Sequence, residues 1–207
     1  MDSKLSIQIR ELTTACILTG GKGSRLDGLD KGLLTVSGKH LVEYCIEKIE
    51  PQVSATYLSA NRNIKTYQSL GYKVIEDSFG DFEGPLAGFL SGLETTTTPY
   101  LVMLPTDAPL FPKDLVTRLL EPIINGKGEA SVANVAGRLH PTFCCVPKDG
   151  KESLINYLHS GQRKILGWLD TLELIKIDFE IEEEFININD KKDLAVASTY
   201  LTNERQI

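Results

Sequence analysis

The sequence predicts an α/β fold in which a mostly parallel β-sheet carries helices on both faces. Between residues 15 and 124, short apolar runs rich in β-branched residues alternate with segments of helical periodicity. Such alternation builds right-handed β-α-β units, whose ligands bind beyond the carboxyl ends of the strands. A binding site is therefore expected at that edge of the sheet.

The predicted elements follow one another along the chain. Strands are expected at Ala15–Leu18, Ala55–Leu58, Tyr72–Ile75 and Tyr100–Leu104, with helices at Leu41–Glu50, Ile64–Leu70, Leu86–Glu94 and Lys113–Ile124. Beyond residue 128 the pattern indicates a small antiparallel excursion, with strands at Ala130–Val135 and Thr142–Val146 around a turn at residues 136–138. A helix at Lys151–His159, a strand at Leu172–Phe179 and a helix at Asp190–Tyr200 follow. We expect one domain over residues 1–207, with residues 1–13 as a polar N-terminal extension.

Composition and charge narrow the function classes. Hydrophobic residues make up 42% and charged residues 24% of the 207 residues, which are ordinary values for a folded globular protein. The formal net charge of −6 argues against general affinity for nucleic acid, because a duplex binder needs a basic face. No apolar run resembles a signal peptide or a membrane span, so we expect a cytoplasmic protein without a membrane partner. The four cysteines lack C-x-x-C spacing and are expected to be buried thiols.

A glycine-rich, basic turn directly follows the first predicted strand, with the sequence Leu18-Thr19-Gly20-Gly21-Lys22-Gly23-Ser24-Arg25. Glycines let backbone N–H groups approach a phosphate chain closely, and cations offset its charge. The spacing matches neither the Walker loop nor the dinucleotide fingerprint. The turn predicts a phosphate-binding site of another kind, and a glycine-rich turn without a ligand is the alternative.

Further candidate residues fall near the same edge. Lys31 follows the turn; most lysines are simply exposed, but the turn upstream favours a phosphate contact. Asp107 follows the most apolar strand and is expected to bind Mg²⁺, which takes one or two carboxylates beside phosphate oxygens. Asp77 ends the third strand, where its side chain either contacts the ligand or caps the following segment. Gly84 and Pro85 open a helix, whose N-terminus either faces an anion or only begins there.

Candidates for a second substrate carry weaker signals. His140 precedes a proline and is equally consistent with a structural role. Lys164, beside Arg163, either binds an anion or complements a helix dipole. Asn187 and Asn189 lie in an apolar run, where Asn189 or its neighbour could instead be a helix N-cap.

Taken together, these segments resemble the molybdenum cofactor guanylyltransferases. The resemblance keeps the family's order from residue 18 to 189 and rests on Leu18-Thr19-Gly20-Gly21-Lys22, Arg25, Asp30-Lys31-Gly32-Leu33-Leu34, Val74-Ile75-Glu76-Asp77, Gly84-Pro85-Leu86-Ala87-Gly88, Thr106-Asp107-Ala108-Pro109, His140-Pro141-Thr142 and Phe185-Ile186-Asn187-Ile188-Asn189. It implies a three-layer Rossmann-like nucleotidyltransferase fold. It also implies transfer of GMP from GTP to molybdopterin carrying molybdenum, with Mg²⁺ as cofactor and release of pyrophosphate. Transient contacts with molybdopterin-loading proteins and apo-molybdoenzymes follow from the same resemblance.

Roles are carried over residue by residue. The resemblance places GTP on Leu18, Thr19, Gly20, Gly21, Lys31, Asp77, Gly84 and Asp107. It makes Arg25, Lys31 and Asp107 the catalytic residues and Asp107 the metal ligand, and Gly28 also matches a nucleotide position. Lys164, Asn187 and Asn189 match positions associated with the pterin.

The sequence departs from the family pattern at three positions. Lys164 stands where the family usually has arginine, and lysine lacks arginine's bidentate grip on phosphate. Asp27 puts a carboxylate near the expected polyphosphate, and Ser59 stands where an asparagine is common, although Asn61 matches.

The alternatives to guanylyl transfer are the functions of a molybdopterin cytidylyltransferase, a sugar-phosphate nucleotidyltransferase and a non-catalytic carrier of nucleotide or pterin.

Overall fold

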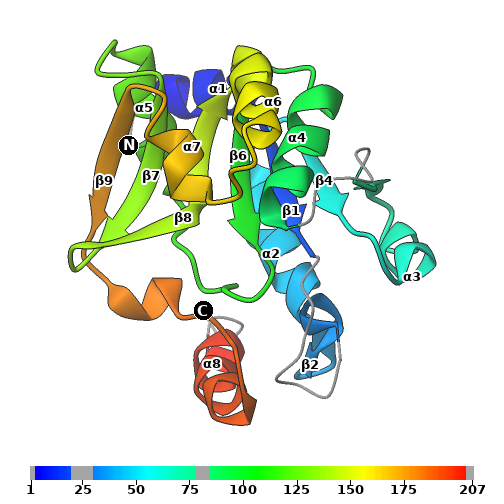
Figure 1. Cartoon of the computed structure of the whole chain (residues 1–207). Helices are drawn as coiled ribbons and strands as arrows, with labels where there is room; N and C mark the ends of the chain where they lie inside the picture. Colours follow the sequence, from blue (N-terminus) through cyan, green and yellow to red (C-terminus); the bar gives the residue numbers. More distant parts are fainter. Residues whose placement is uncertain (1–2, 20–29, 78–83, 204–207) are drawn as a thin grey trace.

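A seven-stranded sheet forms the middle layer of the protein (Figure 1). The computed structural model describes residues 3–19, 30–77 and 84–203. The strands lie in the order β5 (Lys73–Ile75), β4 (Ala55–Ser59), β1 (Thr13–Leu18), β6 (Tyr100–Pro105), β8 (Arg138–Pro147), β7 (Ala130–Val135) and β9 (Leu174–Phe179). Strand β8 runs antiparallel to its neighbours β6 and β7, and the other pairings described for this sheet are parallel. This arrangement confirms the predicted α/β fold with a small antiparallel excursion.

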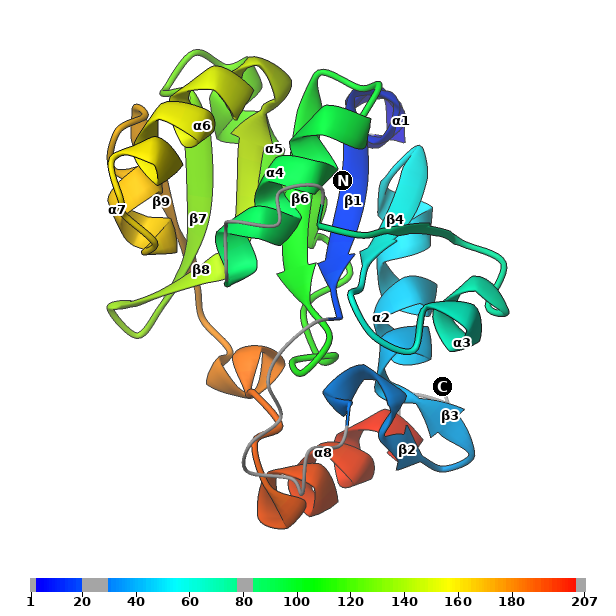
Figure 2. The ribbon, with the colours of Figure 1, turned by 45° about the vertical axis from the view of Figure 1, so that its right-hand side comes forward.

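Helices cover both faces of the sheet (Figures 1 and 2). One face carries α1 (Ser3–Leu12), α2 (Leu41–Ile49) and α5 (Leu115–Ile124), and the other carries α4 (Pro85–Thr95), α6 (Lys151–His159) and α7 (Ile165–Leu169). Side chains of β1 alternate between the two resulting cores, with Ile17 in the first and Cys16 in the second. Burial on both faces explains why the central strands read as unbroken apolar runs.

A third, smaller core lies beyond the carboxyl edge of the sheet. Helix α8 (Lys191–Asn203) packs there beside the hairpin of β2 (Thr35–Val36) and β3 (Lys39–His40), as Figure 2 shows. Its buried side chains are Val36, Leu41, Tyr44, Leu110, Ile188, Ala197 and Leu201. The remaining elements are α3 (Ile64–Gln68) and four short 3-10 helices, η1 (Lys31–Leu33), η2 (Glu50–Gln52), η3 (Lys148–Gly150) and η4 (Glu182–Phe185).

The N-terminal segment is a packed helix where the sequence suggested only a polar extension. In α1, Ile9 is 1% exposed, and Leu5 and Leu12 pack on the same core. Arg10 donates from Nε to the carbonyl oxygen of Val53 at 3.1 Å. Helix α1 therefore packs on the core through a narrow apolar stripe. A stripe of so few residues gives too weak a periodic signal to predict a helix from the sequence.

Two predictions about burial and membranes can be compared with the structure. All four cysteines are buried free thiols, as predicted, and burial raises the pKa of Cys16 to about 12. Over the described residues, no helix combines the length and the apolar character that crossing a bilayer requires.

The docking of α1 can be tested with two isoleucines of the same helix. Ile9→Ala should lower the free energy of unfolding by about 2–5 kcal/mol, because it leaves a cavity in the core. Ile7→Ala is the matched control, since Ile7 is 60% exposed, and its effect should be much smaller. Urea denaturation of both variants measures the difference, and equal effects would contradict the packing of α1.

Candidate functional site

The ends of β1 and β6 form the centre of the carboxyl edge. Thr106 donates from its backbone N and its hydroxyl to the carbonyl oxygen of Leu18, both at 3.2 Å. Thr19 donates in the same way to the carbonyl oxygen of Ser59, at 2.9 Å from N and 2.6 Å from Oγ1. These bonds lock three strand ends together. Leu18 contributes its backbone carbonyl oxygen and Thr19 its backbone N and hydroxyl, and both residues are buried.

The structure brings Lys31, Asp107 and Asn189 together at this edge. Lys31 Nζ lies 2.8 Å from Asp107 Oδ2 and 2.8 Å from Asn189 Oδ1. Lys31 begins η1, Asp107 follows β6, and Asn189 precedes α8. The Lys31 and Asp107 side chains are 25% and 21% exposed, so the pair remains open to solvent and to a ligand.

The segment before α8 is fixed independently of Lys31. Ile188 donates from its backbone N to the carbonyl oxygen of Asp107 at 2.6 Å. Asp190 Oδ1 accepts from the backbone N of Lys192 and Asp193, and Asp193 Oδ2 accepts from the backbone N of Asn189 and Asp190. Backbone hydrogen bonds from Asp193 and Lys192 lower the pKa of Asp190. Asp190 is thus the helix cap, and the side chain of Asn189 turns toward the site.

Asp77 and Asn61 form a second polar pair, beyond the ends of β5 and β4. Asn61 Nδ2 donates to Asp77 Oδ2 at 2.5 Å, and Asn61 Oδ1 accepts from the backbone N of Asp77 at 2.9 Å. Asp77 Oδ1 is buried and has no hydrogen-bond partner among the described residues. Burial raises the pKa of Asp77, and the hydrogen bond from Asn61 opposes that shift.

The glycines of α4 have a structural explanation. Gly84 is exposed and has φ +106° and ψ −179°, a conformation that is essentially restricted to glycine, and Pro85 follows at the first helical turn. A Cβ atom on Gly88 would lie 2.7 Å from Ser59 Oγ and 2.8 Å from Leu18 Cδ2. Gly88 therefore lets α4 lie directly against the ends of β1 and β4, and Ser59 is buried beneath it.

Asn187 borders this cluster, because its carbonyl oxygen accepts from Asn189 Nδ2 at 3.4 Å, whereas the other candidates are held by different contacts. Lys164 is exposed at the N-cap of α7, and no hydrogen bond among the described residues joins it to Lys31, Asp107 or Asn189. Asn187 is exposed as well. Arg163 donates to the carbonyl oxygen of Leu158 at 2.8 Å, near the end of α6. His140 packs on Phe185 with ring centroids 5.4 Å apart, and burial lowers its pKa.

Several residues named from the sequence lie outside the described residues. They are Gly20, Gly21, Lys22, Gly23, Ser24, Arg25, Asp27 and Gly28. The flanking residues, Thr19 and Asp30, are described, so both ends of the glycine-rich segment reach the site edge.

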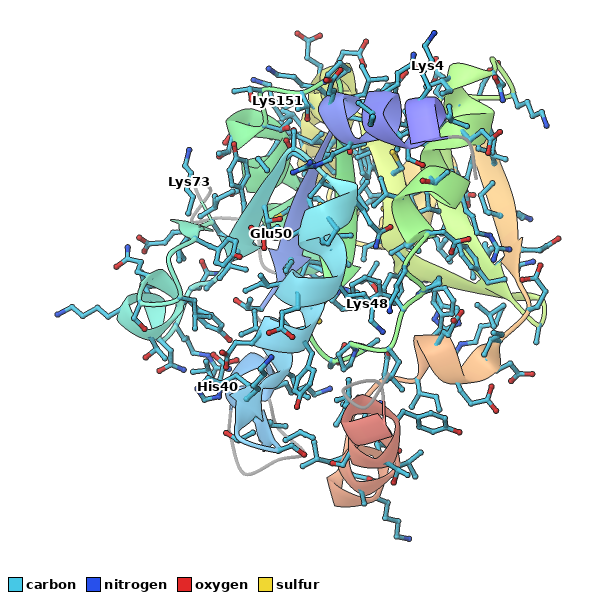
Figure 3. All side chains as sticks on the ribbon, turned by 180° about the vertical axis from the view of Figure 1, so that it is seen from behind. Lys4, His40, Lys48, Glu50, Lys73 and Lys151 are labelled. Atoms are coloured by element: carbon cyan, nitrogen blue, oxygen red, sulfur yellow. The ribbon has the colours of Figure 1, made fainter. Side chains whose placement is uncertain are left out.

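Helix α2 carries a further link to this edge. Lys48 donates to the carbonyl oxygen of Leu110 at 3.2 Å and lies over the ring of Phe111, with Nζ 5.8 Å from the centroid (Figure 3). Leu110 and Phe111 follow Asp107 within a few residues, so α2 supports the chain that carries this carboxylate.

The fold and the site together define a nucleotide-binding α/β protein, with polar and charged residues where the strand order reverses. Residues 15–173 match the model of the MobA-like NTP transferase domain, and the chain belongs to this family.

Relatives of this chain support the same assignment. The molybdenum cofactor guanylyltransferase of Cupriavidus necator is 39% identical over 200 residues, covering 92% of this chain and 98% of that protein. The protein of the same name from Cupriavidus metallidurans is 38% identical, covering 87% and 91% of the two chains.

Solved structures show the same fold. Molybdopterin-guanine dinucleotide biosynthesis protein A from Archaeoglobus fulgidus has a TM-score of 0.73 at 23% identity, covering 92% of this chain and 99% of that one. The 2-C-methyl-D-erythritol 4-phosphate cytidylyltransferase of Thermus thermophilus has a TM-score of 0.67 at 17% identity, covering 90% and 98%. Proteins named for different substrates thus share this architecture, so residues of the site, and not the fold, determine the substrate.

The Asn61–Asp77 pair makes a testable electrostatic prediction. Asn61→Ala should raise the pKa of Asp77 further, because burial then acts without the opposing hydrogen bond. Asn134→Ala is the matched control: it removes a similar amide–carboxylate hydrogen bond, from Nδ2 to Asp178 Oδ1 at 2.5 Å, and should leave the pKa of Asp77 unchanged. Carboxyl NMR titration of Asp77 in both variants measures the difference; an unchanged pKa of Asp77 in Asn61→Ala would refute the assignment.

Proposed function

We propose that this chain transfers GMP from GTP to molybdopterin carrying molybdenum and releases pyrophosphate, which gives the guanine dinucleotide form of the cofactor. The observation that carries the proposal is the contact of Lys31 with Asp107 and Asn189 at the point where the strand order reverses. The names of the curated relatives, at 38–39% identity over most of the chain, support guanylyl transfer.

The reaction is an in-line displacement. A terminal phosphate oxygen of molybdopterin attacks the α-phosphorus of GTP, and the bond from this phosphorus to the pyrophosphate oxygen breaks. No covalent intermediate on the protein is required, so the protein acts by positioning the substrates and stabilising their charge.

Lys31 is suited to bind the triphosphate. An ammonium group has three N–H donors, and two of them point to Asp107 and Asn189. Among the described residues the third has no acceptor, and it is available to a phosphate oxygen. We assign Leu18, Thr19, Gly20, Gly21, Gly84 and Arg25 to the same nucleotide, and Lys164, Asn187 and Asn189 to the pterin.

The donor set at Asp107 fits Mg²⁺. The oxygens of Asp107 and Asn189 are hard donors, and both already lie 2.8 Å from one cationic nitrogen. The described residues contain no group of three or more His, Cys, Asp or Glu side chains arranged around a metal. Phosphate oxygens and waters would therefore complete the coordination beside Asp107. When bound, Mg²⁺ neutralises phosphate charge and polarises the reacting phosphoryl group.

Asp77 supports the choice of guanine. Guanine carries two adjacent donors, N1–H and the N2 amine, whereas cytosine offers one exocyclic amine on its pairing edge. In this proposal the Asp77 carboxylate accepts from that donor pair, because Oδ1 has no hydrogen-bond partner among the described residues and Oδ2 has Asn61 alone. We place the reaction in the cytoplasm, with transient contacts to molybdopterin-loading proteins and to the apo-molybdoenzymes that receive the product.

The role of Asp107 can be tested directly. Asp107→Ala should lower pyrophosphate release with GTP, molybdopterin and Mg²⁺ by about a hundredfold or more, because a charge-stabilising group is lost. Stability should change by less than about 1 kcal/mol, since the ion pair with Lys31 is partly exposed. Asp149→Ala, at the opposite edge, is the control and should retain full activity. Near-normal turnover by Asp107→Ala would overturn the assignment.

Base selection gives a second test. Asp77→Asn keeps the shape but replaces the carboxylate, so the KM for GTP should rise about tenfold or more. In the wild type, GTP affinity should fall as the pH decreases through the raised pKa of Asp77, because the protonated acid loses its acceptor charge. The variant should lack this dependence, and Asp178→Asn serves as control. A wild-type preference for CTP or ATP over GTP would contradict guanylyl transfer.

A further inference from the structure

The phenol of Tyr67 lies against the short helix η1, which begins with Lys31. Tyr67 is fully buried, at 0% exposure, and its hydroxyl donates to Asp30 Oδ1 at 2.7 Å. Asp30 is the N-cap of η1 and directly precedes Lys31. The same oxygen accepts from the backbone N of Gly32 at 3.2 Å, so Asp30 spans the backbone on both sides of Lys31.

The backbone after Lys31 rests on the same hydroxyl. A Cβ atom on Gly32 would lie 2.5 Å from Tyr67 Oη and 3.4 Å from Thr106 Cγ2. Thr106 directly precedes Asp107, so η1 packs at Gly32 against both the phenol and the strand end that carries the carboxylate. The absence of a side chain at Gly32 is what allows this close approach beside Lys31.

Asn63 completes the support from the same segment. Asn63 Nδ2 donates to Asp30 Oδ2 at 3.0 Å, so the two carboxylate oxygens of Asp30 have separate partners. Asn63 has φ +52° and ψ 28°, a left-handed conformation that turns the chain into α3, and its carbonyl oxygen accepts from the backbone N of Tyr67 at 3.1 Å. The turn that supplies the amide donor thus also places the phenol.

We propose that Tyr67 and Asn63 are positioning residues for nucleotide transfer, which act through Asp30 to hold Lys31 in place for the triphosphate. The inference rests on the proposed role of Lys31 in GTP binding. It assigns a function in the reaction to two residues whose side chains hydrogen-bond to Asp30, the residue before Lys31.

The electrostatic environment of the phenol agrees with this role. Burial raises the pKa of Tyr67, and the hydrogen bond to Asp30 acts in the same direction, while the Thr19 side chain opposes it. The phenol therefore stays protonated and remains a donor to Asp30 over the working pH range. Thr19 and Asp30, the two described residues that flank residues 20–29, are both neighbours of this one hydroxyl.

Tyr67→Phe tests the proposal because it keeps the ring and removes the donor. The affinity for GTP, measured by calorimetry on the full chain with Mg²⁺, should fall roughly tenfold, which corresponds to one hydrogen bond to a charged group. Tyr44→Phe is the matched control: Tyr44 is also buried, and its hydroxyl donates to the carbonyl oxygen of Val36 at 2.8 Å. Both variants should lose similar thermal stability, but only Tyr67→Phe should lose GTP affinity.

A variant that lacks the Lys31 ammonium group shows whether Tyr67 acts by positioning Lys31 or only by packing in the core. In Lys31→Met, adding Tyr67→Phe should leave GTP affinity unchanged, because the phenol acts through Lys31, while the loss of stability persists. Asn63→Gly keeps the left-handed backbone and removes the amide donor, so it should weaken GTP binding in the same direction. This variant also tests the proposal if Tyr67→Phe fails to fold.

The measured GTP affinities distinguish failure of this inference from failure of the proposed function. Wild-type GTP affinity in Tyr67→Phe or Asn63→Gly, or an equal loss from Tyr67→Phe with and without Lys31, would overturn the positioning role. Failure of the wild-type protein to bind GTP would overturn both this inference and the proposed function. Tight GTP binding without transfer to molybdopterin would overturn only the acceptor in the proposed function.

Discussion

The parallel pairing of β1 with β6 is the constraint on which the site depends. The chain leaves β1 for α2 on one face of the sheet and reaches β6 from α4 on the other face. Two hydrogen bonds from Thr106 to the carbonyl oxygen of Leu18 keep the strand ends in register. Because the strand order reverses here, segments from both directions of the fold converge at this edge. Close packing at Gly32 and Gly88 allows them to approach.

Charge at this edge is arranged for positioning and contributes little to stability. The whole chain carries a formal net charge of −6, so an anionic substrate meets a favourable field only where a cation is held locally. Lys31 provides it, yet its ion pair with Asp107 is about one-fifth to one-quarter exposed. Such pairs contribute about 0–1 kcal/mol to folding, and the long lysine side chain loses rotamer entropy when it is held. The fixed supports around Asp30 are therefore better explained by ligand binding than by stability.

Most of the sheet could be predicted from the sequence because its central strands are buried on both faces. Apolar runs such as residues 100–104 then stand out, and the convergence of parallel strand ends predicts Lys31 and Asp107 at one edge. The contact of Lys31 with Asn189 could not be predicted from local pattern, since 158 residues separate them. Tyr67 falls in a predicted helix, where an aromatic residue indicates only core packing. Helix α7 is five residues long, too short to produce a periodic signal.

Asn189 connects the N-terminus of helix α8 to Lys31, although the two segments are held in place by separate contacts. Helix α8 has its own core with the β2–β3 hairpin, and its N-terminus is capped by Asp190 and Asp193. None of these bonds uses the side-chain oxygen of Asn189, which accepts from Lys31. The cap and the packing of α8 are therefore separate from its contact with Lys31, and the position of Asn189 is set by α8 itself.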